Sequence, residues 1–271
     1  MIKQLYKESI DFVSQVKDNQ FVIRELVKRD LKGRYVKNYF GLSWTILEPL
    51  FLILTLWFVF SYIFPSNRLP DIPYITYLIS GYIPFLFFSN SINQSTNSIT
   101  AYSFVLKKTD FRLAIIPIIK IITETILHSF VVFLAVAIIL LKGIPISIFI
   151  IQVLYYQFSL FILLIALGWI TSTVSVLFPD FKLIINIIIR LLFYLTPVFW
   201  NLSMFPKKYH FIFKLNPLFY IVEGYRDSLI FGIGFWERSD SAIYFWTFTA
   251  IVFLLSVLIF KRLRNHVLDV I

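Results

Sequence analysis

Six long apolar stretches limit what this chain can fold into more than any other feature. They cover residues 43–64, 74–100, 115–141, 147–178, 183–201 and 242–261. Most reach the roughly 20 residues that a tilted helix needs to cross about 30 Å of hydrocarbon. Apolar residues make up 59% of the 271 residues, more than a soluble domain of this size could bury. The sequence therefore predicts an all-α integral membrane protein with six transmembrane helices.

The distribution of basic residues predicts how these helices are oriented. If both termini lie inside, the inner segments carry 16 Lys and Arg residues and the outer segments carry seven. The inner segments are 1–42, 101–114, 179–182 and 261–271, and the outer ones are 65–73, 142–146 and 202–241. The positive-inside rule then predicts that both termini are cytoplasmic. The net charge of +10 comes from these basic residues beside the apolar spans. We therefore expect no nucleic-acid partner.

Two segments outside the spans are predicted to form short helices. Residues 1–42 place apolar side chains at helical spacing, which fits amphipathic helices on the inner membrane surface or a solvated helical pair packed on the rest of the chain. Residues 202–241 are too apolar for a free loop, so we expect two re-entrant helices in the outer leaflet, broken at Asn216 and Pro217. Residues 43–271 form one transmembrane domain in this interpretation.

The second span changes character halfway along its length. Its first half is apolar, whereas residues 89–103 read SNSINQSTNSITAYS. Lipid offers no partners to so many polar side chains. This half must therefore face either protein or a water-filled path.

Motifs for catalysis or metal binding are missing from the sequence. It has no Cys, no Gly-x-x-x-x-Gly-Lys, no His-Glu-x-x-His, no nucleophile elbow and no EF-hand loop. Glu124 and His128 are four residues apart and could form a proton relay. A structural hydrogen-bonded pair, joined by Lys120, explains them better because no second cluster completes a proton path. We therefore expect a chain without catalytic residues, metal or cofactor, and not an enzyme.

Aromatic residues are unusually frequent, with 31 Phe, 15 Tyr and 6 Trp. Interfacial belts explain some of them, and a ring taken singly can simply face lipid. Rings that line a path would suit a sugar polymer, because the C–H faces of sugars stack on them without fixed hydrogen bonds. The candidates for such a path are Tyr39, Phe40, Trp57, Phe58, Phe193, Tyr194 and Phe199.

Several motifs, in order along nearly the whole chain, resemble one known family. They are LVKRDLKGRYVKNYFGLSWTILEPL (26–50), the basic loop around Lys107 and Lys108, FPDF (178–181), YLTPVFW (194–200) and LNPLFYIVEGYRDSL (215–229). With six spans, this series resembles the transmembrane subunit of ABC-2 type exporters for O-antigen, capsule and wall teichoic acid.

The resemblance implies partners and a cargo. We expect a homodimer with two copies of a separate ABC ATPase, which would bind ATP and Mg, in the bacterial cytoplasmic membrane. The cargo would be a polyprenyl-pyrophosphate-linked glycan or teichoic acid. Residues 101–116 would form the coupling loop, either as a helix docked on the ATPase or as a loop that only satisfies topology. Its candidate coupling residues are Lys107, Lys108, Asp110 and Arg112.

The resemblance also places RYVKNYFGLSW (34–44) where an interface helix turns into the first span, beside a lateral opening for the lipid head group. There Arg34 and Lys37 can meet phosphate, and Gly41 permits a sharp turn. Arg190 lies inside the fifth span, where an idle charge facing lipid is costly. It either joins the pyrophosphate site or forms an ion pair with Glu124 or Asp180. An ABC-2 permease for a drug or lipid, and a proton-coupled carrier, are the alternative functions.

Overall fold

The computed structural model describes residues 19–33, 39, 41–63, 72–108, 112–145 and 147–270. In these ranges the chain is built from helices, which confirms the all-α class. Their bounds are α2 (Gln20–Gly33), α3 (Trp44–Phe58), α4 (Tyr74–Thr96), α5 (Ser98–Ala101), α6 (Ser103–Lys108), α7 (Ile115–Leu141), α8 (Gln152–Leu177), α9 (Phe181–Leu195), α10 (His210–Lys214), α11 (Pro217–Arg226) and α12 (Ser239–Val270). Single π-helical turns extend α3 (Val59–Ile63) and α11 (Asp227–Phe231).

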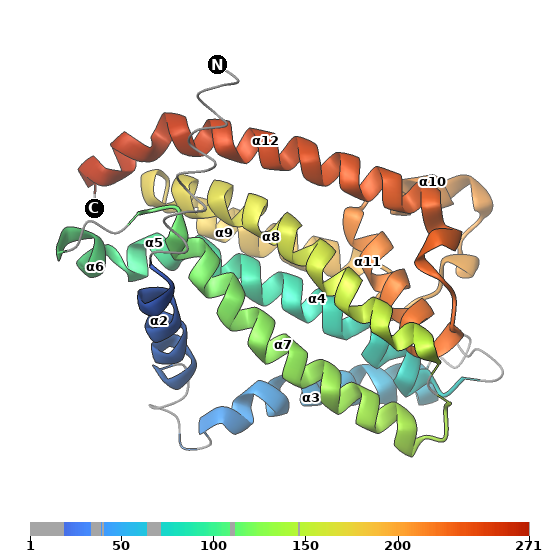
Figure 1. Cartoon of the computed structure of the whole chain (residues 1–271). Coiled ribbons are helices and arrows are strands. Elements are labelled where there is room, and N and C mark those ends of the chain that lie inside the picture. Colours follow the sequence, from blue (N-terminus) through green and yellow to red (C-terminus); the bar gives the residue numbers. More distant parts are fainter. Residues whose placement is uncertain are drawn as a thin grey trace.

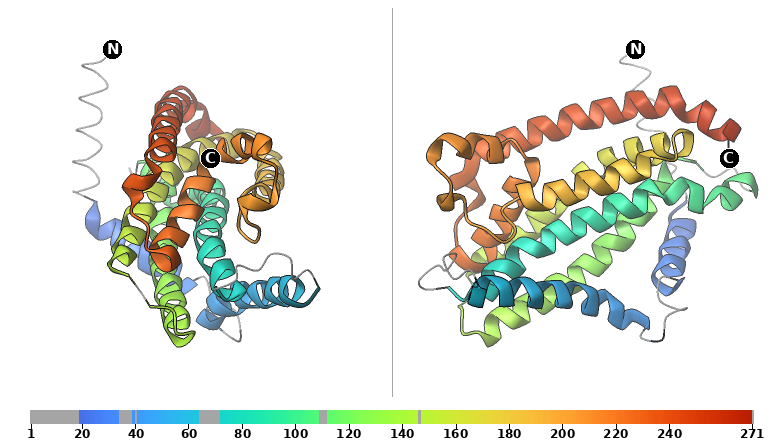
Figure 2. Two further views of the ribbon diagram at one scale, coloured as in Figure 1. Left: turned by 90° about the vertical axis from the view of Figure 1, so that its right-hand side faces the viewer. Right: turned by 180° about the vertical axis from the view of Figure 1, so that it is seen from behind.

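The long helices run lengthwise through the molecule, and short elements lie at its two ends (Figure 1). Helices α4, α7, α8 and α12 form the body of the bundle. Helix α2 crosses one end, next to α5, α6 and the C-terminus, whereas α10 and α11 lie at the opposite end. Seen from behind, α4 lies between α9 and α3 (Figure 2), and it packs against both. The ends therefore separate the predicted inner and outer segments.

Four described helices are long and apolar enough to cross a membrane: Tyr74–Thr96, Ile115–Leu141, Ile148–Leu177 and Phe235–Val270. The other two predicted spans are shorter. Leu47–Ile63 is an apolar helix of intermediate length. Helix α9 has 15 residues, a rise of about 22 Å against about 30 Å of hydrocarbon. It ends because Thr196 precedes a proline and takes an extended conformation. The count of six spans stays a prediction.

Helix α4 is the centre of the core, and several serines of the polar stretch that continues into α5 face protein. Ser91, Ser95 and Ser98 have no exposed surface. The hydroxyl of Ser95 donates to the carbonyl of Ser91 at 2.7 Å, and Ser175 on α8 donates to the carbonyl of Thr96 at 2.6 Å. Burying a hydroxyl costs little free energy when it forms a hydrogen bond within the bundle. Of the two explanations for this polar stretch, the structure supports packing against protein for these buried serines, whereas Asn97 and Thr100 of the same stretch are exposed.

Helix α2 is fixed to the bundle by a buried polar contact. Its Asp30 lies 2.8 Å from the Nζ of Lys120 on α7 and accepts a hydrogen bond of 2.6 Å from the hydroxyl of Tyr102. Leu26 and Val27 pack against the first turns of α7. Burial, together with the hydrogen bond to Asp30, raises the pKa of Tyr102 above its usual range. The second predicted N-terminal helix is therefore confirmed and packs on the bundle; residues 1–18 lie outside the described residues.

This contact gives Lys120 a partner that the sequence did not indicate. The spacing along α7 suggested a structural pair of Glu124 and His128 joined by Lys120, and Lys120 pairs with Asp30, which lies far upstream on α2. A helix that crosses the end of α7 brings this carboxylate to Lys120.

Candidate functional site

Three of the predicted path residues form an aromatic cluster at the end of α9. The ring centroids of Phe193 and Tyr194 are 5.4 Å apart, those of Phe193 and Phe199 5.5 Å, and those of Tyr194 and Phe199 6.1 Å. The chain reverses at Thr196 and returns Phe199 onto the last turn of the helix. The rings meet because the reversal follows directly after the helix.

Other elements extend this aromatic cluster with rings that the sequence did not reveal. Phe60 stacks on Phe199 at 5.3 Å, and Phe85 and Tyr82 of α4 lie 5.2 and 6.3 Å from Phe193. Tyr194 stays 65% exposed, so one side of the cluster is open. The cluster thus combines three segments: the end of α3, the middle of α4 and the α9 turn.

The remaining ring candidates lie elsewhere. Trp57 and Phe58 contact Tyr62, at centroid distances of 5.8 and 5.5 Å. Tyr39 is fully exposed, and Phe40 lies outside the described residues. The structure therefore brings together Phe193, Tyr194 and Phe199.

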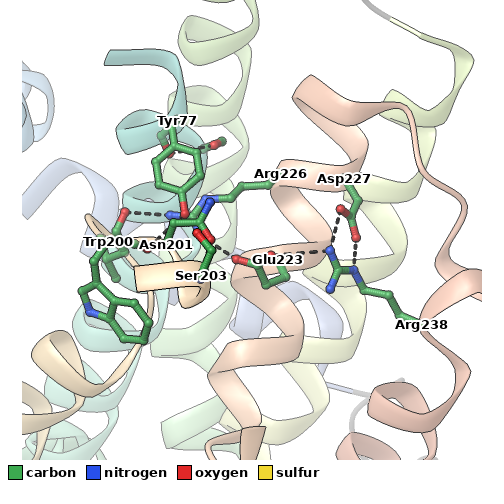
Figure 3. Close-up of polar contacts among 10 residues, drawn as sticks. Tyr77, Trp200, Asn201, Ser203, Glu223, Arg226, Asp227 and Arg238 are labelled. Atoms are coloured by element: carbon green, nitrogen blue, oxygen red, sulfur yellow. Dashed lines mark hydrogen bonds and ion pairs between the residues drawn. The ribbon is translucent and has the colours of Figure 1, made fainter. Parts of the chain in front are cut away.

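A second cluster, of charged residues, is buried behind the α9 turn where α11 meets α4 (Figure 3). The side chain of Arg226 has 0% exposure. It donates to Glu223 at 2.6 Å and to the carbonyl of Val198 at 2.8 Å. Its guanidinium also lies 3.7 Å from the ring centroid of Tyr77, close enough for a strong cation–π contact. Arg226 therefore joins α11, α4 and the turn after α9.

Arg238 adds a second cation to this charged cluster. It forms a bidentate pair with Asp227, with one N–O distance of 2.9 Å, and lies 3.4 Å from Glu223. Burial raises the pKa of the Asp227 carboxyl, and the Arg238 guanidinium opposes that shift. Two cations and two carboxylates pair with one another, which offsets the cost of burying charge in a protein. Among the described buried side-chain atoms of this cluster, only the Nε of Arg226 has no hydrogen-bond partner. The charged cluster fixes α11 relative to the start of α12.

Small residues and hydrogen bonds fit α4 to the charged cluster. A Cβ at Gly81 would lie 2.5 Å from Nη2 of Arg226, so α4 can approach only because this residue is glycine. The hydroxyl of Tyr77 donates to the carbonyl of Trp200 at 3.0 Å. None of the candidate residues predicted from the sequence belongs to this charged cluster. The signal was present, since Glu223, Arg226 and Asp227 share one face of a helix in an otherwise apolar segment.

The predicted helix break in the outer segment is confirmed. Asn216 caps α11, with its side-chain oxygen accepting from the backbone N–H of Leu218 at 3.0 Å, and Pro217 occupies the first turn. The Asn216 side chain also donates to the hydroxyl of Thr196 at 2.8 Å. The turn after α9 and the start of α11 are thereby held together.

The predicted phosphate-binding residues are only partly described. Arg34 and Lys37 lie outside the described residues, but Gly41 at the start of the first apolar helix has a φ of +48°, the turn that its identity predicted. Arg190 is exposed on α9. Among the described residues, no carboxylate lies within ion-pair distance of it, so the alternative pairing with Glu124 or Asp180 is not formed.

His128, the histidine that could belong to a proton relay, is held by contacts with two other helices. The Nε2 of His128 shares a hydrogen bond of 2.7 Å with the hydroxyl of Tyr225, and its ring stacks on Phe87 at 4.5 Å. Both His128 and Glu124 are buried. These contacts tie α7 to α11 and α4, which supports the structural interpretation.

The inner loop contains the predicted short helix as α6. Lys107 and Lys108 end this helix, Asp110 lies outside the described residues, and Arg112 is exposed. The loop is therefore partly helical, next to the end of the bundle that α2 crosses (Figure 1).

Comparison with known families decides the identity. The sequence profile of the ABC-2 type transporter family matches residues 22–230, which include the aromatic cluster, the α11 part of the charged cluster and most of the bundle. This chain belongs to the ABC-2 type transporter family.

Named relatives of this ABC-2 chain match over most of their length. It is 28% identical to the O-antigen export system permease protein RfbA of Klebsiella pneumoniae, covering 90% of this chain and 93% of that protein. It is 27% identical to the polysialic acid transport protein KpsM of Escherichia coli, covering 91% and 95%. It is 22% identical to the capsule polysaccharide export inner-membrane protein CtrC of Neisseria meningitidis, covering 83% and 84%.

Proposed function

We propose that this chain is the transmembrane subunit of an ATP-driven exporter of a cell-surface polysaccharide. The observation that carries the proposal is the match, over nine-tenths of the chain, to permeases named for O-antigen and polysialic acid transport. The cargo is a glycan linked to polyprenyl pyrophosphate, or a wall teichoic acid, and it moves outwards. The chain itself hydrolyses nothing.

The aromatic cluster supports a sugar cargo over a drug or a lipid. Phe193, Tyr194 and Phe199 present ring faces and edges at a partly exposed site. Aromatic rings give many weak contacts that do not fix a polymer in one register. A sliding chain needs such contacts, and the rings from α3 and α4 enlarge the surface.

The membrane arrangement follows the basic residues and the two ends of the bundle. Six helices span the inner membrane, with α3 and α9 completing the set, and both termini lie in the cytoplasm. Residues 1–42 form the interface segment and residues 43–271 the transmembrane domain. Helices α10 and α11, at the end opposite α2 (Figure 1), are the re-entrant helices of the outer leaflet.

The partners are a separate ABC ATPase in two copies and a second copy of this chain. The ATPase binds ATP and Mg, and α6 with Lys107, Lys108, Asp110 and Arg112 docks on it as the coupling segment. Helices α3 and α9 lie to either side of α4 (Figure 2). Both carry exposed apolar side chains, including Phe51, Phe58 and Leu191. These faces are suited to line a path shared with the second copy.

The lipid pyrophosphate is held by basic residues that precede the first apolar helix and by one on α9. Arg34 and Lys37 precede the first apolar helix, and Arg190 is exposed on α9 without a carboxylate partner among the described residues. A guanidinium stays charged in a low dielectric and binds phosphate oxygens in pairs. Arg190 is therefore available to a phosphate rather than committed to an internal ion pair.

Deletion and complementation test the proposal. A strain lacking this chain should lose its surface polysaccharide and accumulate lipid-linked polymer inside the cell, and the intact gene should restore export. Restoration should also require an ATPase partner with an intact P-loop. Normal surface polysaccharide in the deletion strain, or complementation by the chain when that ATPase is inactive, would overturn the proposal.

A further inference from the structure

A groove of about 390 Å³ lies between α2 and α7, at the end of the bundle that α2 crosses. This volume is within the range of about 300–1,000 Å³ that ligand pockets occupy. Helix α7 and the buried side of α2 line it with aliphatic side chains, and three polar residues of α2 stand at its edge. The lining residues are Gln20, Ile23, Arg24, Val27, Lys28, Leu31, Ile115, Ile118, Ile122 and Ile126.

The shape of the groove follows from the spacing of its isoleucines. Ile115, Ile118, Ile122 and Ile126 recur every three or four residues and share one face of α7. This stripe rises about 16 Å along a helix that is long enough to span the membrane. Ile126 is 46% exposed, so the groove opens at its far end. The result is a narrow apolar slot that runs from the crossing of α2 towards the hydrocarbon.

The edge of the groove on α2 is basic. Arg24 is exposed, and none of the described carboxylates pairs with it. Lys28, one turn further along, forms an exposed hydrogen bond of 2.7 Å with Glu25, and such pairs contribute little. Asp30, the other acid of α2, is occupied by Lys120 and Tyr102. The apolar slot thus begins at a site with a net positive charge.

We propose that this groove binds one acyl chain of an anionic phospholipid of the surrounding membrane, with its phosphate at Arg24 and Lys28. A slot along a membrane-spanning helix is filled from the lipid phase, and the basic edge selects a negative head group. Attraction to anionic lipid of about 1 kcal/mol per basic residue corresponds to about fivefold in binding for each. The site does not depend on which cargo is exported.

The bound lipid would add to the contacts that hold α2 against α7. Helix α2 is then held on the bundle by its polar contact through Asp30, by the packing of Leu26 and Val27, and by the lipid. The position of α2 would therefore respond to the anionic lipid content of the membrane.

Photolabelling of the purified full chain in nanodiscs tests this proposal. The probes are phosphatidylglycerol and phosphatidylcholine, each with a diazirine in one acyl chain. We expect phosphatidylglycerol to label the 115–126 stripe or α2 in preference to phosphatidylcholine. Arg24→Gln and Lys28→Gln should each reduce this preference about fivefold, whereas Lys32→Gln, on the same helix but outside the groove, should not. Ile122→Trp should fill the slot and abolish labelling there by both lipids.

Three outcomes would overturn the proposal. The first is equal labelling of this stripe by the two lipids. The second is an unchanged preference in Arg24→Gln and Lys28→Gln variants whose thermal unfolding matches the wild type. The third is displacement of the label by polyprenyl phosphate but not by excess phosphatidylglycerol, which would assign the groove to the carrier lipid. Failure here leaves the export function untouched, because complementation tests that separately.

Discussion

Replacing Arg226 by Met should destabilise the outer end of the bundle severely. The guanidinium has 0% exposure and donates to Glu223 and to the Val198 carbonyl. Met keeps much of the volume but leaves Glu223, among the described residues, with only the longer contact to Arg238, at 3.4 Å. Removing one partner from a buried pair costs about 3–5 kcal/mol. We expect the lower part of this range, about 3 kcal/mol, because the Glu223 side chain is 17% exposed.

The measurement is the free energy of unfolding of the purified chain in detergent, from denaturant titration. Lys214→Met, at an exposed site on α10, is the matched control and should change stability by less than about 0.5 kcal/mol. Glu223→Gln combined with Arg226→Met should recover part of the loss, because the uncompensated carboxylate is then gone. A loss below about 1 kcal/mol for Arg226→Met would refute the argument that this charged cluster holds α11 in place.

Three further predictions concern transport. Replacing Phe193 and Phe199 together by Leu should lower export on the order of tenfold, because two ring contacts of about 0.5–1.5 kcal/mol each are lost. The control Phe133→Leu, at an exposed position on α7, should leave export unchanged. Normal export in the Phe193 and Phe199 double variant would mean that these rings only face lipid. Lys107→Glu with Lys108→Glu should reduce recovery of the ATPase on co-purification severalfold, and unchanged recovery and coupling would rule out docking through α6. Arg190→Ala should abolish export although the complex still assembles, whereas Arg190→Lys should retain part of the export activity. If Arg190→Ala instead loses the folded subunit, and removal of Glu124 restores folding, Arg190 has a structural role.

Local sequence patterns predicted the elements whose causes are local. The apolar runs and their periods located the long helices, Gly41 marked a turn with positive φ, and Asn216 with Pro217 marked the start of α11. Phe193, Tyr194 and Phe199 were found together because a single reversal of the chain joins them.

The contacts that depend on distant segments were not predictable in the same way. Lys120 pairs with Asp30, because α2 crosses the end of α7, and no spacing within α7 signals this. Arg226 depends on the Val198 carbonyl and on Gly81, which belong to two other elements. Phe60 and Phe85 join the aromatic cluster only through the packing of α3, α4 and α9. Tertiary packing decides such partners.

Reconstituted transport tests the central claim most directly. This chain and its ATPase would be placed in proteoliposomes with a lipid-linked glycan on the ATPase side, and translocation would be measured as protection of the glycan from an added glycosidase. We predict protection that requires ATP and both proteins, and that persists when an ionophore removes the membrane potential. Protection without ATP, or its loss when the potential is removed, would contradict the assignment as an ATP-driven polysaccharide exporter.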